Sequence, residues 1–171
     1  NKYTDLNPQF IFNLPGYNFR NNEIGAVIGL SQLTRLKKNV LKRNKNFQYF
    51  LDNINGNRFF KDFDLIGSSN YAFNLIIKQK DKIFAKKLMD NMEKNKIEFR
   101  RGSVGGGNQL RQPYLKKYLK KINHSDFPIT DHIHFYGFYI GNYPDLSKEE
   151  IKFICKIINE VWVFKKWVLK F

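Results

Sequence analysis

The sequence contains a single cysteine, Cys155, among 171 residues. One cysteine excludes an internal disulfide, and it excludes an all-cysteine metal or iron–sulfur site built within one chain. Around Cys155, apolar residues recur at helical spacing, at Ile151, Ile154, Ile158 and Val161. We therefore interpret Cys155 as a residue of the hydrophobic core.

Long apolar runs are missing as well. None approaches the roughly 20 residues that a membrane-spanning helix needs, and the N-terminal segment NKYTDLNPQF lacks the apolar stretch of a secretory signal. From these absences we expect a soluble, cytoplasmic protein with no membrane partner. The chain opens on Asn1 rather than on methionine, so we interpret it as a piece of a longer protein.

Common catalytic and phosphate-binding signatures are also missing. The triple glycine at 105–107 is not part of a G-x-x-x-x-G-K-S/T motif, so it is not a nucleotide P-loop. There is no H-E-x-x-H zinc motif and no serine-hydrolase signature. His132 and His134 are two positions apart, which on a helix turns them away from each other, and we predict no metal site.

Charge is present in excess and with one sign. The chain has 30 lysine and arginine residues against 15 acidic residues, a net charge of +15. Such a balance is typical of nucleic-acid-binding proteins. Here the lysines are scattered, and only Arg100–Arg101 and the lysines of 116–121 gather. We therefore expect no nucleic-acid partner, although a basic nucleic-acid-binding module is the alternative from another class, and an anionic small ligand would also benefit from the positive field.

Periodicity and turn residues predict the order of elements. Apolar residues every three to four positions predict a long helix over 22–54, and β-branched and aromatic residues predict two strands separated by a turn within 63–78. The remaining expected elements are a helix at 81–95 with Asp81 as N-cap, a strand at 97–101, a loop at 102–113, a short basic helix at 114–121, a helical turn or two near 129–136, a strand at 138–142, and a helix at 148–163 begun by a capping box of Ser147 and Glu150.

This order predicts an α/β fold in which a long N-terminal helix leads into a small mixed or antiparallel sheet with helices on one face. We divide the chain into an aromatic lead, a turn and a connecting helix over 1–54, and a small α/β domain over 55–171. Composition and spacing by themselves support no more than this, together with a glycine-rich loop flanked by arginines.

Two separated motifs carry a resemblance to a known family. The segments GYNFRNNEIGAVIGLSQLTRL (16–36) and GFYIGNYPDLSKEEI (137–151) resemble, in the same order, motifs of the DegT/DnrJ/EryC1/StrS sugar aminotransferase family. The resemblance implies the C-terminal domain of a fold-type I enzyme whose cofactor is pyridoxal 5'-phosphate. It further implies a homodimer with shared active sites. The large cofactor-binding domain and the catalytic residues are then expected upstream, so we assign no catalytic residue here and expect the fragment to be inactive alone.

The family resemblance also implies roles for residues of the lead. Asn18 corresponds to an asparagine that contacts the cofactor phosphate in the partner's site, and a phosphate needs such rigidly held donors. Arg20 would add positive charge nearby, or pair with Glu23 to hold the turn. The alternative for Asn18 is a simple helix cap. Phe10 and Phe12 would line the face of the sugar, with core packing as the alternative for each.

The loop RRGSVGGGNQLRQPYL (100–115) refines the resemblance. It is similar to the branch of the family that removes a 3-hydroxyl from a nucleotide-linked 4-keto-6-deoxy sugar in deoxysugar and O-antigen biosynthesis. Asn108 and Arg111 are the candidate contacts to the sugar or its diphosphate, with a purely structural loop as the alternative. In such a reaction the cofactor acts as an electron sink while the hydroxyl leaves. A nucleotide-sugar aminotransferase is the alternative function.

Overall fold

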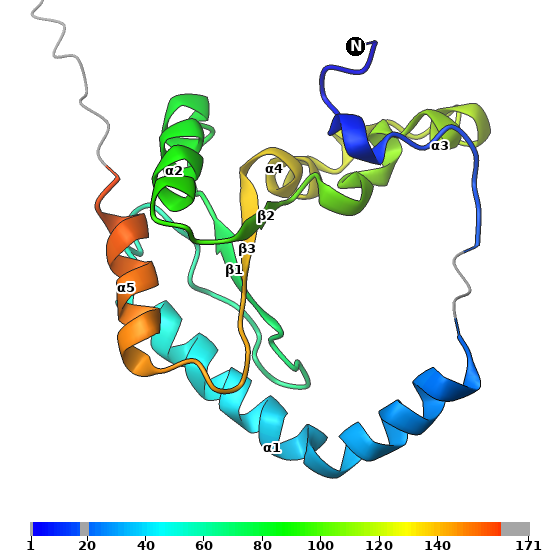
Figure 1. Ribbon diagram of the computed structural model, residues 1–171. Coiled ribbons are helices and arrows are strands. Elements are labelled where there is room, and N and C mark those ends of the chain that lie inside the picture. The colour runs from blue at the N-terminus through cyan, green and yellow to red at the C-terminus, as the bar shows by residue number, and fades with distance from the viewer. Residues whose placement is uncertain (1, 18–20, 162–171) are drawn as a thin grey trace, which may run out of the picture.

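The computed structural model describes residues 2–17 and 21–161. Its longest element is α1 (Glu23–Asn53), which starts where the side chain of Asn22 accepts a hydrogen bond of 2.8 Å from the Gly25 N–H (Figure 1). It ends at Ile54, whose backbone is extended. The long helix predicted over 22–54 is confirmed.

A three-stranded antiparallel sheet forms the centre of the fold. Its strands are β1 (Ala72–Ile76), β2 (Phe99–Arg101) and β3 (Gly137–Gly141), in the order β1-β3-β2. The register places both Phe73 and Phe99 opposite Ile140. Because alternate residues of a strand point to opposite faces, these three apolar side chains lie on the same face of the sheet.

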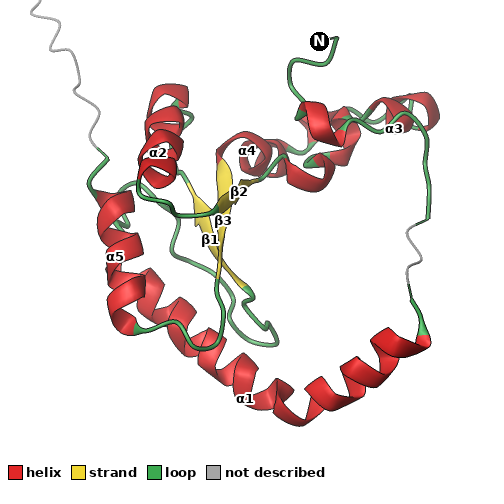
Figure 2. Cartoon of the chain, in the orientation of Figure 1, coloured by secondary structure: helices red, strands yellow, loops and turns green. Residues whose placement is uncertain are grey.

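Helices cover that apolar face. They are α2 (Lys82–Lys94), α5 (Lys148–Asn159) and the C-terminal half of α1, which lie on the same side of the sheet (Figure 2). The core is rich in aromatic rings, and Phe50 of α1 stacks on Phe73 of β1 with 4.6 Å between ring centroids. The expected fold class, a small antiparallel sheet with helices on one face, is confirmed.

Short helices gather with the N-terminal lead at one end of the sheet (Figure 1). They are α3 (Pro113–Tyr118), α4 (Pro128–Tyr136) and the 3₁₀ turns Pro8–Phe10, Val104–Gly106, Gln109–Arg111 and His124–Asp126. The turns Pro8–Phe10 and Gln109–Arg111 both lie at this end of the molecule, although about 100 positions separate them in the sequence. The loop predicted at 102–113 is also here.

Local capping rules held in detail. The Asp81 side chain accepts hydrogen bonds from the first turn of α2, and Ser147 and Glu150 form the reciprocal capping box that begins α5. Cys155 is buried in α5, and burial raises the pKa of its thiol to about 12, as fits a core residue.

Two predictions about element bounds are wrong. The segment 63–69, where the first strand was expected, is not a strand. Among the described residues, the only pairing outside the three-stranded sheet is an isolated bridge between Phe59 and Ile77, the residue after β1. Phe63 and Leu65 instead pack against the core as irregular chain. The last helix, predicted to run to residue 163, ends at Asn159, and the described residues after it are not helical.

The N-terminal half of α1 extends away from the core. Its apolar side chains are exposed: Ile24, Val27, Ile28, Leu30, Leu33 and Leu36. Gly29 likewise has open space where a side chain would begin. Within the described residues, no helix is long and apolar enough to cross a membrane. The exposed stripe is therefore an apolar surface that residues 2–17 and 21–161 leave uncovered.

Candidate functional site

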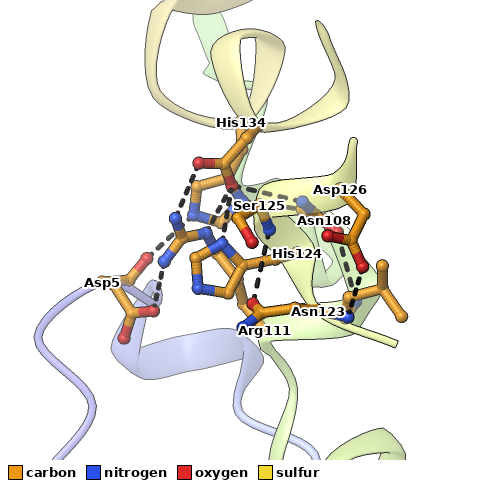
Figure 3. A network of polar contacts seen from close by, with 10 residues as sticks. Asp5, Asn108, Arg111, Asn123, His124, Ser125, Asp126 and His134 are labelled. Carbon is orange, nitrogen blue, oxygen red and sulfur yellow. Dashed lines mark hydrogen bonds and ion pairs between the residues drawn. The ribbon is translucent and has the colours of Figure 1, made fainter. Parts of the chain in front are cut away.

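The centre of the candidate site is the buried guanidinium of Arg111. Its Nε and Nη2 donate to the two oxygens of Asp131 at 2.6 and 2.7 Å, and Nη1 donates to Asp5 Oδ2 at 2.7 Å (Figure 3). The guanidinium also lies 4.8 Å from the centroid of the Phe135 ring. Bidentate pairing fixes a guanidinium in both distance and plane, so Arg111 joins the loop, α4 and the N-terminal lead.

Asn108 begins the same 3₁₀ turn and is tied to α4. Its backbone N–H donates to His134 Nδ1 at 3.0 Å, and its side-chain amide donates to Asp131 at 3.2 Å. Gly107 makes this approach possible, because its φ of 58° is left-handed and a Cβ there would lie 2.2 Å from His134 Nδ1. The glycine before Asn108 is therefore required by packing against the histidine ring.

His134 is held in one neutral tautomer. Its Nδ1 accepts the Asn108 N–H, so the proton is on Nε2, which donates to the Asp5 carbonyl at 2.8 Å. Burial lowers the pKa of His134. The histidine thus supplies directed hydrogen bonds rather than charge.

The acidic partners of Arg111 are kept ionised. The hydrogen bond from Arg111 lowers the pKa of Asp131, outweighing the opposing effect of burial. For Asp5 burial alone would raise the pKa, but the hydrogen bond and charge of Arg111 hold it below its usual value. The same ion pairs raise the pKa of Arg111, first through Asp131. The single positive charge of Arg111 is therefore shared by two carboxylates, and one negative charge is in excess among these three groups.

Gln112 fastens the N-terminal lead to the loop. Its side-chain amide donates to the Phe10 carbonyl at 2.8 Å and accepts the Phe12 N–H at 2.9 Å. A third bond, from the Tyr114 N–H to the Phe12 carbonyl at 3.2 Å, continues the pairing. Because Gln112 is fully buried, its hydrogen bonds to the lead are shielded from water. Residues 10–12 are therefore fixed to the loop.

The residues predicted from sequence fall into three groups. Asn108 and Arg111 lie together in the network, where their side chains bind other groups of this chain. Phe10 is half-buried and Phe12 is exposed at the start of the turn. Asn18 and Arg20 lie outside the described residues. The ligand contacts assigned to all six stay predictions.

Four residues of the network were missed by sequence reasoning: Asp5, Gln112, Asp131 and His134. Gln112 was quoted only as part of the loop motif, and the two aspartates carry no local signal, because their partners are 20 and 106 positions away. His134 was considered only as a metal ligand. Among the described residues, no group of three or more His, Cys, Asp or Glu side chains is arranged to hold a metal ion.

The fold is that of a known class, the small domain of fold-type I pyridoxal-phosphate enzymes. Its features here are the small antiparallel sheet, the long helix that leads into it, and the loop that Arg111 holds in place. The comparison with protein families is more specific. The chain belongs to the DegT/DnrJ/EryC1/StrS aminotransferase family, whose sequence profile matches residues 2–159. The resemblance carried by the two motifs is thereby confirmed.

Relatives with curated descriptions include GDP-4-keto-6-deoxy-D-mannose 3-dehydratases. The Escherichia coli protein is 29% identical over 88% of this chain, and the Yersinia pseudotuberculosis protein is 27% identical over 88%. The lipopolysaccharide biosynthesis protein RfbH of Salmonella typhimurium is 26% identical over 85%. The chain spans 38%, 38% and 33% of the length of these relatives, respectively.

Solved structures agree with the sequence relatives. The E. coli GDP-4-keto-6-deoxy-D-mannose 3-dehydratase with bound hydrated PLP superposes with a TM-score of 0.68 at 29% identity, covering 88% of this chain and 38% of that one. The same kind of enzyme with a trapped PLP-glutamate geminal diamine gives 0.65 at 30% identity, covering 85% and 37%. Helicobacter pylori PseC, an aminotransferase, gives 0.61 at 20% identity, covering 84% and 38%, which shows a shared fold alone.

Proposed function

We propose that this chain is the C-terminal part of a pyridoxal-phosphate enzyme that removes the 3-hydroxyl from a nucleotide-linked 4-keto-6-deoxy sugar. The observation that carries the proposal is the similarity to two GDP-4-keto-6-deoxy-D-mannose 3-dehydratases over 88% of the chain. The similarity to RfbH supports a role in lipopolysaccharide biosynthesis and, with it, a cytoplasmic location.

The geometry of the lead fits a segment that reaches into another subunit. Gln112 holds residues 10–12, and beyond them the turn leaves the body of the molecule, with Leu14 and Tyr17 74% and 93% exposed. Asn21 and Glu23, which follow residues 18–20 outside the described part of the chain, are exposed too. A segment that is anchored at Phe10 and Phe12 and exposed on both sides of Asn18 suits Asn18 as a donor to a cofactor phosphate across a subunit boundary.

Pyridoxal phosphate, when bound, would supply an electron sink that lets a proton leave the carbon bearing the nitrogen while the 3-hydroxyl of the sugar departs. The residues of this chain bind and orient. Asn18 holds the cofactor phosphate and Arg20 adds positive charge beside it. Phe10 and Phe12 pack against the sugar, while Asn108 and Arg111 fix the loop that faces its diphosphate.

A homodimer is part of the same proposal. The exposed stripe on the first half of α1, with Leu30 67% exposed, is an apolar surface of the kind that subunit or domain contacts cover. Gly29 leaves room for close approach of another backbone. Sedimentation of the full-length protein tests this: we expect a dimer, and a monomer at micromolar concentration would contradict shared active sites.

The activity is tested with the full-length polypeptide that contains this chain. Incubation with pyridoxal phosphate, excess glutamate as amino donor and reductant, and GDP-4-keto-6-deoxymannose should yield the 3-deoxy sugar, detected by mass spectrometry. Formation of an amino sugar instead would make the protein an aminotransferase. Binding of duplex DNA at physiological salt with no turnover of nucleotide sugars would favour the nucleic-acid alternative.

The role of Asn18 has its own test. Asn18→Ala removes a donor to a charged phosphate, and such bonds contribute about 1.5–3 kcal/mol. We therefore expect the Kd for pyridoxal phosphate to rise by about 10- to 100-fold. Asn13→Ala, an exposed asparagine on the other limb of the turn, is the matched control and should leave the Kd unchanged. Equal effects of the two variants would remove Asn18 from the cofactor site.

A further inference from the structure

A cavity of about 560 Å³ lies beside the Arg111 network. None of the residues proposed above to contact the cofactor or the sugar lines it. Its walls come from the N-terminal lead at 4–8, the first two turns of α2, the end of β2 and the last turn of α4. The polar residues that line it include two cations, Lys82 of α2 and Arg101 at the end of β2, and the hydroxyl residue Ser103 just after β2. The volume is in the range of small-ligand pockets.

Ser103 is the most informative of the three. Its side chain lines the cavity, the residue is 5% exposed, and its Oγ has no hydrogen-bond partner in the described structure. Buried hydroxyls are almost always paired, because a lone one has lost its hydrogen bonds to water. An unpaired hydroxyl at a polar cavity indicates a partner that enters from outside the chain.

The charges around the cavity favour an anion. Within the described residues, Lys82 and Arg101 form no salt bridge. Asp5, the carboxylate in the wall, shares the single positive charge of Arg111 with Asp131. His134, also in the wall, is neutral because its Nδ1 accepts the Asn108 N–H. The two cations Lys82 and Arg101 thus outweigh the one negative charge that the Arg111 network leaves uncompensated.

We propose that this cavity binds a phosphate-bearing anion, with Arg101 and Lys82 supplying charge and Ser103 supplying a hydroxyl donor. Phosphate oxygens accept from several donors at once, which matches a guanidinium, an ammonium and a hydroxyl that line one cavity from two segments, the end of β2 and the start of α2. The site differs from the one predicted at Arg111, whose bonds go to Asp131 and Asp5. The proposal does not depend on the dehydratase activity.

The test uses the full-length protein saturated with pyridoxal phosphate, so that the cofactor phosphate site is filled. Inorganic phosphate and pyrophosphate are titrated by calorimetry at constant ionic strength. We expect one saturable site, and Arg101→Gln should raise the Kd at least about 10-fold, the loss of one charge-assisted contact. Absence of saturable binding would overturn the proposal.

Arg100→Gln is the matched control. Arg100 is the neighbouring residue of β2, so its side chain points to the opposite face of the sheet, and it does not line the cavity. It should leave the Kd for pyrophosphate unchanged. An equal loss in both variants would mean that the general positive field binds the anion. Equally tight binding of acetate, lost in Arg101→Gln, would assign the site to carboxylates and overturn the phosphate assignment.

Ser103→Ala separates ligand binding from folding. Because the hydroxyl has no partner in the described structure, its removal should leave the Tm without anion unchanged or raised. The rise in Tm produced by pyrophosphate should shrink. A lower Tm with unchanged pyrophosphate affinity would show that the hydroxyl serves the fold and would overturn its role in binding.

Discussion

The two halves of α1 share one helical pattern but have opposite environments. In the C-terminal half, Phe47, Phe50 and Leu51 are buried against the sheet and α5. In the N-terminal half, the leucines and isoleucines at equivalent spacing are exposed. One continuous helix therefore contains both a core segment and a surface segment that the described part of the chain does not cover.

The difference between the two halves shows what an apolar stripe on a helix can predict. Periodicity predicts that a helix face is covered, but it does not say by what. For the second half of α1 the cover is this domain, while for the first half it lies outside the described chain, consistent with the proposed subunit and domain contacts. Side chains of the same type should therefore contribute very differently to the stability of this chain.

The largest expected effect tests that contrast directly. Phe50→Ala removes a fully buried ring stacked on Phe73 and should lower the free energy of unfolding by about 3–5 kcal/mol. Leu30→Ala, in the exposed half, should change it by less than about 0.5 kcal/mol. Urea unfolding of both variants of the chain measures the difference. Equal losses would break the comparison, because they would require cover over the first half.

Ion pairs sharpen the same contrast. Arg111→Ala leaves two carboxylates without their buried partner, and we expect a loss of about 2–3 kcal/mol of unfolding free energy. Asp145→Asn breaks the exposed pair that Asp145 makes with Lys42 of α1, and solvent screening should leave stability unchanged. Chemical denaturation at low and high salt checks both. A salt-sensitive loss confined to Asp145→Asn would contradict the ranking.

Burial also affects protonation, through His134. Its pKa in the folded state is below the ordinary value near 6.5, so below that pH the unfolded chain binds more protons. Stability should therefore fall as the pH drops from about 6.5 towards the folded pKa, by at most about 1.4 kcal/mol per pH unit. Asp5 and Asp131, whose pKa values are lowered, add a loss near and below pH 4.

The variant His134→Gln isolates the histidine contribution. It should be less stable at pH 8 and should lose the slope between pH 6.5 and 5 while keeping the loss below pH 4. Thermal unfolding across this range measures both windows. An unchanged slope in His134→Gln would assign the upper window to another group.

The smallest effect compares two helix caps. Ser147 caps α5, which packs against the covered half of α1, so Ser147→Ala should cost about 1 kcal/mol of global stability. Asn22 caps the exposed half, where the first turns can unfold locally, so Asn22→Ala should reduce helicity there with little global cost. Hydrogen exchange resolves the two. A global loss in Asn22→Ala would show that the exposed half folds cooperatively with the core.

Prediction from sequence succeeded where the signal is local. The side chains of Asp81 and Ser147 accept from backbone N–H groups two or three positions away, and both caps were identified. The strand expected at 63–69 failed because strand propensity does not create a hydrogen-bonding partner, and the edge of β1 pairs with Phe59 instead. Local pattern decides elements more reliably than it decides pairing.

The candidate site was harder to predict for the same reason. Sequence analysis pointed to Asn108 and Arg111, but the groups they bind come from α4 and the lead. No spacing rule relates Arg111 to Asp5, 106 positions earlier. The residues of the loop identified it as a candidate site from the sequence. The groups that bind the loop, Asp5, Asp131 and His134, could be found only from the folded structure.

The bonds from Gln112 to Phe10 and Phe12 also set an order of events during synthesis. Within this chain the lead is translated before its docking partner, which follows about 100 residues later, and closing so long a loop is entropically costly. The lead therefore stays undocked while the sheet is still being made, and the segment after Phe12 acquires its fixed direction only after Gln112 has been translated.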